Sequence, residues 1–325
     1  MLPLLYQNVK NDIPAAMRSE LKAVHRHFWI QNQQLFRKLE AMLASLQAAE
    51  VPTLVLKGAA LSVLHYRNMA ARPMSDFDIL IPEEHGPTVV RKFIGEGWSP
   101  DWVPKTAPYI PYFYRYRHAL NLVHAQRGTF DLHWHVMFHA THKGADEQFW
   151  AGSVALTVKS IITRSLNPSD QLLHSCIHGY EFNDLPSIRW IADALTIIRT
   201  SQIDWERIVR VATDLRLTVP CAEQFEFLNS AFDAGVPESC ISRLAQYPVS
   251  NRERGYFRRM TADPFLRSWR ETLEDVWEAT SRANRDRSFF HRLLCLPRHL
   301  QLQQELGSLG KLVPHAFVFL RRRFG

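Results

Sequence analysis

A chain of 325 residues is long enough for two domains of ordinary size, and its 46% hydrophobic and 22% charged residues are typical of a soluble globular protein. No apolar run approaches the ~20 residues that cross a bilayer, and Gly/Ser-rich or Pro-rich tracts are absent, which excludes membrane-spanning and low-complexity classes. The formal net charge of +7 arises within residues 251–325, which carry 15 Lys+Arg and 8 Asp+Glu, so attraction to an anionic partner should come mainly from that quarter.

The start of the chain and its cysteines indicate a cytoplasmic protein. The first six residues lack the long apolar core of a signal peptide. The four cysteines show no paired spacing, so we expect reduced thiols rather than disulfides.

The N-terminal part alternates between helical and strand patterns. Residues 14 to about 49 carry apolar side chains at roughly helical spacing and predict one or two helices. The predicted elements that follow are, in chain order, a buried strand at 51–56, a helix at 58–66, a strand at 77–81 and a helix at 84–96.

Two aspartates, Asp76 and Asp78, open the second predicted strand. Strand side chains alternate between faces, so both carboxylates should point the same way. Carboxylates a few ångströms apart repel each other and are normally kept together where a cation compensates. Magnesium is the usual cation, because it takes hard oxygen ligands and leaves positions for phosphate oxygens. Taken alone, such a pair is most often a strand-end turn with two solvated aspartates; the metal interpretation depends on the strand–glycine–helix unit before it and the later Asp131.

An aromatic segment and a predicted strand pair come next. Residues 98–117 are rich in aromatic residues and proline, and we interpret them as an extended, partly irregular segment near the acidic face. Residues 119–124 and 129–136 predict paired strands joined by a tight turn at Arg127 and Gly128.

The second strand of this pair carries three polar residues on one face, namely Asp131, His133 and His135. Asp131 is a candidate third carboxylate beside the acidic pair, with His133 as a neighbouring contact. An Asp-x-His-x-His pattern is also compatible with a transition-metal site, and His135 fits a histidine whose hydrogen bonds are satisfied within the fold.

Beyond these strands the pattern changes. Residues 149 to about 166 are predicted to connect onward, and long helical patterns begin at Pro168. Three residues are predicted helix N-caps: Ser169, Ser187 and Asp204. We therefore predict two domains, residues 1–167 with the N-terminal helices and a helical domain at 168–325 with a basic tail.

Two polar pairs mark the predicted helical domain. His174 and His178 share a helix face, whereas Cys176 points elsewhere, which argues against a three-ligand zinc site. We favour a polar stripe that faces the first domain. Arg189 and Asp193 have the spacing of an intrahelical ion pair, although both would reach the nucleotide or acceptor if the helices close over it.

A glycine turn after one strand, an Asp-x-Asp at the next and a lone Asp on a later strand is the layout of DNA polymerase β-like nucleotidyltransferases. Within that superfamily, the chain resembles the bacterial nucleotidyltransferase family often found beside peptide and exopolysaccharide biosynthesis genes. The resemblance runs from roughly residue 20 to 220 and is carried by LKGAAL at 56–61, RPMSDFDIL at 72–80 and DLHW at 131–134.

This resemblance implies an α/β fold, in which a polymerase β-like core with a small mixed sheet is followed by a C-terminal helical domain. It implies Mg²⁺-dependent transfer of a nucleoside monophosphate from an NTP to a hydroxyl, with release of pyrophosphate. Mn²⁺ is an alternative metal, and ATP is the expected donor.

The resemblance also implies roles for particular residues. Asp76, Asp78 and Asp131 would hold the metals, and Asp131 would help to activate the acceptor hydroxyl. The residues expected to contact the nucleotide are Lys57, Gly58, Ser62, Arg72 and His133. Polymerase β-like enzymes usually have Gly or Ser after the turn glycine, whereas this chain has Ala59.

Several alternatives stay open. The same metal site would serve a kinase that phosphorylates a peptide or sugar hydroxyl. A non-catalytic, nucleotide-binding scaffold in a biosynthetic cluster is a third function. Lys57 is equally compatible with a solvated lysine, and Arg72 with an ion pair to Asp76 or Asp78.

The expected partners are an NTP and a small-molecule, sugar or peptide acceptor. Nucleic acid is not expected, because the basic surplus is modest and the sequence contains no recognisable nucleic-acid-binding module. Residues 312–324 are apolar and then basic, which fits either a docked helix with a solvated tip or contact with an anionic membrane surface.

Overall fold

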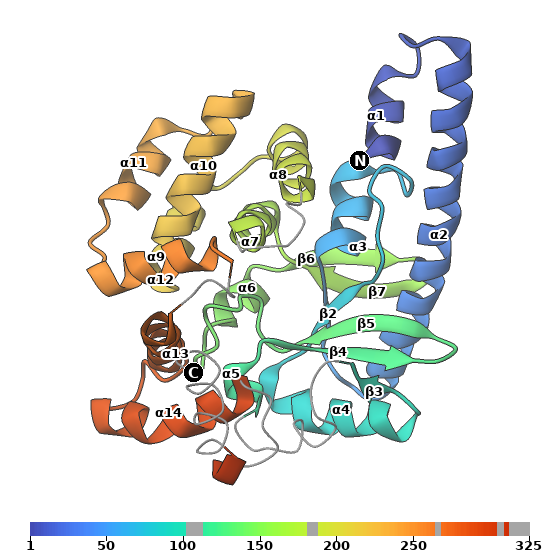
Figure 1. Cartoon of the computed structure of the whole chain (residues 1–325). Coiled ribbons are helices and arrows are strands. Elements are labelled where there is room, and N and C mark those ends of the chain that lie inside the picture. Colours follow the sequence, from blue (N-terminus) through green and yellow to red (C-terminus); the bar gives the residue numbers. More distant parts are fainter. Residues whose placement is uncertain (102–112, 181–187, 264–267, 304–308, 312–325) are drawn as a thin grey trace, which may run out of the picture.

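A seven-stranded mixed sheet forms the centre of the N-terminal half in the computed structural model, which describes residues 1–101, 113–180, 188–263, 268–303 and 309–311 (Figure 1). Its strand order is β3-β4-β5-β2-β1-β7-β6. The strands are β1 (Leu54–Leu56), β2 (Asp78–Leu80), β3 (Ser99–Pro100), β4 (Ala119–His124), β5 (Gly128–His133), β6 (Val154–Val158) and β7 (Ile161–Ser165). The α/β class predicted from the sequence is confirmed.

The central strands β2 and β5 set the positions of Asp78, Asp131 and His133. β1 is antiparallel to β2, and β2 is parallel to β5. Because strand side chains alternate, each central strand presents one set of side chains to each layer of helices. Val55, Ile79 and Leu132 belong to one core cluster, whereas Leu56 and Leu80 belong to the other.

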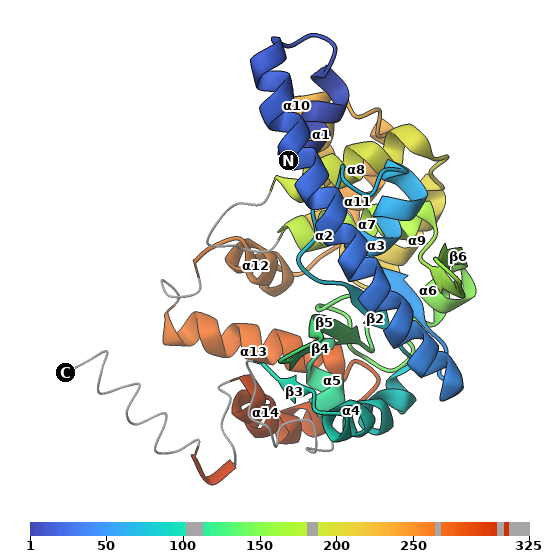
Figure 2. The ribbon, with the colours of Figure 1, turned by 90° about the vertical axis from the view of Figure 1, so that its right-hand side faces the viewer.

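Two N-terminal helices, α1 (Leu2–Val9) and α2 (Ala15–Ala48), lie along one side of the molecule (Figure 2). The second half of α2 packs its apolar side chains, among them Phe36 and Leu43, into the same core cluster as Val55 and Ile79. The 34-residue α2 therefore covers one sheet face together with α4 (Gly86–Gly95), as the helical spacing at 14–49 predicts.

Short helices connect the strands. The predicted helix at 58–66 consists of α3 (Lys57–Leu61) followed by a π-helical turn, η1 (Ser62–Tyr66). The other short elements are η2 (Glu83–His85), α5 (Phe113–Tyr116) and α6 (Glu147–Ala151). The π-turn ends at Arg67, whose left-handed backbone (φ 49°) ends the helix.

The C-terminal half is helical. Its elements are α7 (Pro168–Tyr180), α8 (Arg189–Thr200), α9 (Trp205–Asp214), α10 (Thr218–Phe232), α11 (Glu238–Gln246), α12 (Asn251–Met260), α13 (Trp269–Ala283), α14 (Phe289–Gln303) and η5 (Leu309–Lys311). Leu172 and Cys176 of α7 share one core cluster with Leu56 and Leu80, so α7 packs on the sheet face opposite α2. The hydrophobic core thus crosses residue 167, and a domain boundary there stays a prediction.

Several local predictions need correction. The segment at 149–166 is not a simple connection, because it contains α6 and the β6–β7 hairpin, which turns at Lys159 (φ 52°) and extends the sheet. The turn before β5 spans residues 125–127, and Gly128 already pairs with His124.

Two of the three predicted helix caps can be checked. The side chain of Asp204 accepts a hydrogen bond from the Arg207 backbone N–H (2.9 Å), which confirms it as an N-cap. At α7 the prediction of Ser169 is wrong, because the side chain of Asn167 accepts from the Asp170 N–H (3.0 Å). The Ser169 hydroxyl instead accepts from the Asp204 N–H (2.7 Å). Ser187 lies outside the described residues.

The described aromatic residues of the segment at 98–117 lie in the hydrophobic core and not near the acidic face, so that prediction is wrong. Trp98 packs edge-on against Phe130 (4.9 Å between ring centroids), and Tyr114 packs against Trp134 (4.7 Å). These rings lie in the core cluster that contains α2 and α4, because burial of large apolar rings stabilises the core. Residues 102–112 and the tail at 312–324 lie outside the described residues. Within the part of the chain that the structure describes, no helix is both long and apolar enough to cross a membrane.

Candidate active site

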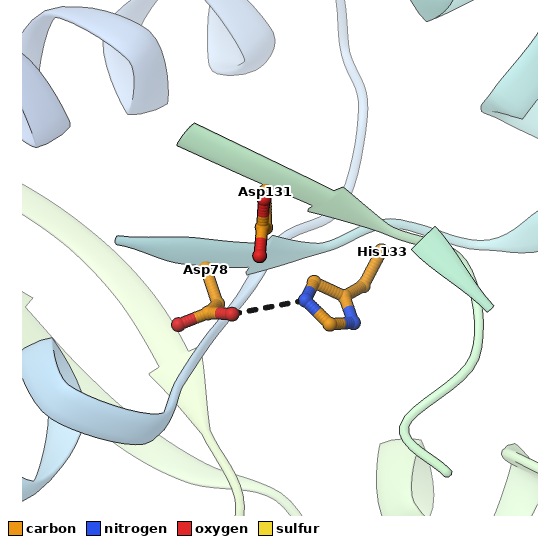
Figure 3. A group of neighbouring side chains, drawn as sticks. All are labelled: Asp78, Asp131 and His133. Atoms are coloured by element: carbon orange, nitrogen blue, oxygen red, sulfur yellow. Dashed lines mark hydrogen bonds and ion pairs between the residues drawn. The ribbon is translucent and has the colours of Figure 1, made fainter. Parts of the chain in front are cut away.

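The parallel pairing of β2 and β5 brings Asp78 and Asp131 together. In the parallel ladder, Asp78 is paired directly with Asp131, and Leu80 with His133. The two carboxylates therefore project from neighbouring strands on the face that α7 covers, and Figure 3 shows both with His133 reaching the Asp78 carboxylate. One ligand atom each from Asp78, Asp131 and His133 lies within 4.8 Å of the others.

Asp76 lies just outside the strand, because β2 begins at Asp78 rather than at Asp76. It lines the same cavity as Asp78 and Asp131, a space of about 420 Å³ between the sheet and the helices α7 and α8. Burial and the neighbouring carboxylates of Asp78 and Asp131 raise the pKa of Asp76. The cavity therefore concentrates negative charge, and a bound cation would relieve this repulsion.

Lys57 supplies part of the compensating charge. Its Nζ lies 2.6 Å from Asp78 Oδ1, and His133 Nε2 lies 3.0 Å from the same oxygen. Burial alone would raise the pKa of Asp78, but Lys57 and His133 hold it well below its usual range. The alternative of a solvated Lys57 is therefore wrong for this structure. Its backbone is left-handed (φ 43°), a conformation that is costly for residues other than glycine.

Asp131 is oriented by β4, the neighbouring strand on the side away from β2. Asn121 on β4 lies directly opposite Asp131 in the antiparallel pair. Its Nδ2 donates to Asp131 Oδ1 (2.7 Å). This amide orients the carboxylate without adding charge, and the other carboxylate oxygen remains able to bind a metal.

Arg72 pairs with Asp193 and not with Asp76 or Asp78. Its Nε donates to Asp193 Oδ1 (2.9 Å) and its Nη2 to Asp193 Oδ2 (2.8 Å), a bidentate pair that links the sheet to α8. The Tyr66 hydroxyl donates to the same Asp193 Oδ1 (2.7 Å). Burial disfavours the charge on Arg72, but Asp193 outweighs it and raises the pKa of Arg72. The contacts of Asp193 are thus with Arg72 and Tyr66, which are distant in sequence, and the intrahelical pair with Arg189 stays an open alternative.

Gly58 is constrained by Arg72. A Cβ at this position would lie 2.3 Å from Arg72 Nη1 and 2.9 Å from Met74 Sδ. The glycine lets the guanidinium approach the backbone at the rim of the cavity, where both residues line the wall.

Helix α7 forms the opposite wall. His174 and His178 line the cavity, whereas Cys176 between them is fully buried in the core, as the predicted polar stripe requires. Burial, followed by the charge of Lys57, holds the pKa of His174 well below its usual value, so this imidazole is neutral.

Ser62, a predicted nucleotide contact, and His135, which the sequence also allows to be held within the fold, both lie outside the group. Ser62 is 1% exposed, and its hydroxyl lies 3.8 Å from Met74 Sδ rather than in the cavity. β5 ends at His133, so His135 leaves the shared face and instead contacts Asp146 (Nδ1 to Oδ2, 2.6 Å). Burial alone would lower the pKa of His135, but Asp146 raises it. A three-ligand site from Asp131, His133 and His135 is therefore not formed.

The donor set fits a hard divalent cation. Asp78 and Asp131 offer carboxylate oxygens, with Asp76 on the same cavity wall. Oxygen ligands are what Mg²⁺ and Mn²⁺ prefer. His133 is better suited to hold Asp78 than to bind the ion, because its Nε2 is already in contact with that carboxylate.

Sequence reasoning missed two residues that shape the site, Asn121 and Asn32, and it did not predict that Asp193 would pair with Arg72. Asn121 is a polar residue within an otherwise apolar strand pattern, the only sign of its role. Asn32 is 0% exposed on α2, and its Nδ2 donates to the carbonyl of Arg72 (2.8 Å), which anchors the segment leading to Asp76. The available signal was a polar asparagine four residues from both Phe28 and Phe36, on the apolar side of the predicted helix.

Comparison with known proteins supports the catalytic interpretation. The sequence model of a family described as "Uncharacterised nucleotidyltransferase" matches residues 1–233. Among solved structures, the lincomycin-bound lincosamide antibiotic adenylyltransferase LnuA is similar at 17% identity, over 51% of this chain and 97% of that chain. Its TM-score of 0.36 is too low to support an argument. No curated protein matches the chain.

Proposed function

We propose a Mg²⁺-dependent reaction for this chain, which belongs to the nucleotidyltransferase family and is therefore an enzyme that transfers nucleoside monophosphates. In the proposed reaction, NMP passes from an NTP to a hydroxyl of a small-molecule, sugar or peptide acceptor. Pyrophosphate would be the second product. ATP is the proposed donor, and the cytoplasm is the proposed compartment.

One observation carries the proposal. The Asp78–Asp131 pairing in the β2–β5 ladder aligns two carboxylates beside a third, Asp76, in a cavity that also holds basic side chains. Such a juxtaposition is costly without a cation, and a triphosphate supplies the anionic charge that Lys57 and Arg72 would bind. The combination supports a metal–triphosphate site better than a structural ion-pair network.

The proposed chemistry is an in-line displacement at the α-phosphorus. The acceptor oxygen forms a bond to that phosphorus, while the bond from phosphorus to the α,β-bridging oxygen breaks and pyrophosphate leaves with the electron pair. Asp131 takes the proton of the acceptor hydroxyl, and its orientation by Asn121 keeps one carboxylate oxygen available for it. Mg²⁺ held by Asp76, Asp78 and Asp131 would stabilise charge on the attacking and leaving oxygens.

The basic side chains have a separate proposed role. Arg72 is fixed by Asp193, so its guanidinium is already oriented when the triphosphate arrives, which lowers the entropic cost of binding. Lys57 would exchange part of its contact with Asp78 for a phosphate oxygen. The helical region from residue 168 onward would close the cleft, with His174 and His178 facing the nucleotide or acceptor.

The experiment uses ATP labelled at the α- or the γ-phosphorus, with Mg²⁺ and glycerol as a surrogate hydroxyl acceptor. We expect α-label on glycerol together with free pyrophosphate, and loss of both in Asp78→Asn. Asp204→Asn is the matched control, because asparagine caps a helix as well as aspartate and the residue does not line the cavity. Release of ADP with γ-label on glycerol would select the phosphotransferase function, and nucleotide binding without turnover the scaffold function.

A further inference from the structure

A second cavity of about 410 Å³ adjoins the proposed catalytic cavity. It lies between the N-terminal helices, represented by Leu4 and Phe28, and the segment that leads to β2, represented by Pro73 and Met74. Its volume falls in the range of small-molecule sites, roughly 300–1,000 Å³. Nothing in the proposed function so far accounts for it.

The two cavities are neighbours. Arg72, Ser75 and Arg189 line both of them, so the two cavities meet at these residues. Asp131, which would meet the acceptor hydroxyl, lines only the catalytic cavity. The acceptor therefore approaches from the Asp131 side, and the second cavity lies on the side of Arg72 and Ser75.

The chemistry of the two cavities differs. The catalytic cavity is lined by the carboxylates, Lys57 and two histidines, which suit phosphate and metal. The second is lined mainly by apolar and aromatic side chains: Leu4, Phe28, Tyr66, Ala71, Pro73 and Met74. A ligand with an anionic end and a flat, weakly polar end matches this pair of environments.

We propose that the second cavity binds the nucleobase of the NTP, with Phe28 as its stacking surface. The inference rests on the proposed function, because the triphosphate must lie in the catalytic cavity for its base to reach Phe28. Phe28 is only half-buried on α2, so its ring is available to a ligand, and aromatic rings stack on any base. Gln31, three residues further along the same helix, lines the cavity with an amide that can donate to and accept from the edge of a base.

The test compares two probes that share the phosphate chain but differ in the base. Binding of Mg²⁺ complexes of ATP, GTP, CTP and UTP, and of inorganic tripolyphosphate, is measured by calorimetry on wild-type protein and on Phe28→Ala. We expect Phe28→Ala to weaken NTP binding roughly tenfold while leaving tripolyphosphate binding unchanged. Trp29→Ala is the matched control, since this adjacent aromatic residue is 48% exposed and does not line the cavity, and it should leave both affinities unchanged.

Two further variants complete the design. Phe28→Leu keeps apolar volume but removes the flat face, so it should give a smaller loss of NTP affinity and remains informative if the alanine variant folds poorly. Gln31→Ala should change the ratio of affinities among the four NTPs, because it removes a group that contacts the edge of the base. An unchanged ratio would count against the assignment of Gln31.

The outcomes separate this inference from the proposed function. Equal NTP affinity in wild type and both Phe28 variants would overturn the nucleobase site and indicate that the cavity serves another ligand, such as part of the acceptor. An equal loss of NTP and tripolyphosphate affinity would also overturn it, because the effect would then not concern the base. Failure of wild-type protein to bind either probe would instead contradict the proposed metal–triphosphate site.

Discussion

The pair between Arg72 and Asp193 provides the sharpest stability prediction. Its side chains are only 11% and 5% exposed, so solvent screens the pair weakly. Asp193→Ala would leave a buried guanidinium without its bidentate partner and would also remove the acceptor of the Tyr66 hydroxyl. Removal of one member of a buried ion pair costs about 3–5 kcal/mol of unfolding free energy. We expect the lower end, about 3 kcal/mol, because Asp78 also attracts Arg72.

The assay is urea unfolding of wild type, Asp193→Ala, Tyr66→Phe and the double variant Arg72→Met/Asp193→Ala. Tyr66→Phe removes a single hydrogen bond and should cost about 1 kcal/mol. The double variant should be more stable than Asp193→Ala alone, because it removes the orphaned charge. A loss below about 1 kcal/mol for Asp193→Ala, or a double variant less stable than the single one, would refute the view that the pair neutralises a buried charge.

Two further predictions concern packing and pH. Gly179→Ala would place a Cβ 2.1 Å from Cγ of Trp190, and this overpacking should lower the free energy of unfolding by about 1–3 kcal/mol. Gly95→Ala is the control, because a Cβ there meets nothing within 4 Å, and it should be neutral or stabilising. Thermal unfolding of both variants checks this prediction. Burial, with a smaller effect of Arg117, lowers the pKa of His299 to about 3. Below about pH 6.5 the unfolded state therefore binds a proton at His299, whereas the folded state does not. The free energy of unfolding should then fall as the pH drops from 6.5 toward 3, and it should be about 2 kcal/mol lower at pH 5 than at pH 8. Urea unfolding across this pH range should show a shallower decline for His299→Asn than for wild type, and equal slopes would contradict the prediction.

The acidic residues were predictable because strand alternation and short motifs are local. The Asp76-x-Asp78 spacing and the later Asp131 predicted one shared acidic site. The parallel register of β2 and β5 aligns Asp78 with Asp131, whereas Asp76 lies before β2, so strand alternation does not place it. The sheet and the helical C-terminal half followed from patterns of two and 3.6 residues. The assignment of catalytic and nucleotide-binding roles to these residues stays a prediction.

The long-range contacts were not predictable, because a single sequence does not specify which distant polar residue meets a given side chain. Asp193 has the local spacing of a pair with Arg189, yet tertiary packing brings Arg72, 121 positions earlier, to its carboxylate. The β6–β7 hairpin was missed since its outward-facing residues, such as Ile162 at 76% exposure, blur the alternation that marks a strand. The aromatic rings around Trp98 filled the core rather than the acidic face, which composition alone does not reveal.

The most direct test of the central claim is calorimetric titration of ATP, GTP, CTP and UTP with Mg²⁺ into wild-type protein and into Asp76→Asn/Asp78→Asn, with retention of the fold checked by circular dichroism. We predict that wild type binds at least one NTP and that the double variant binds it at least about tenfold more weakly, because the cation that bridges carboxylates and phosphates is lost. Equal affinity in the two folded proteins would contradict a metal–triphosphate site at these aspartates.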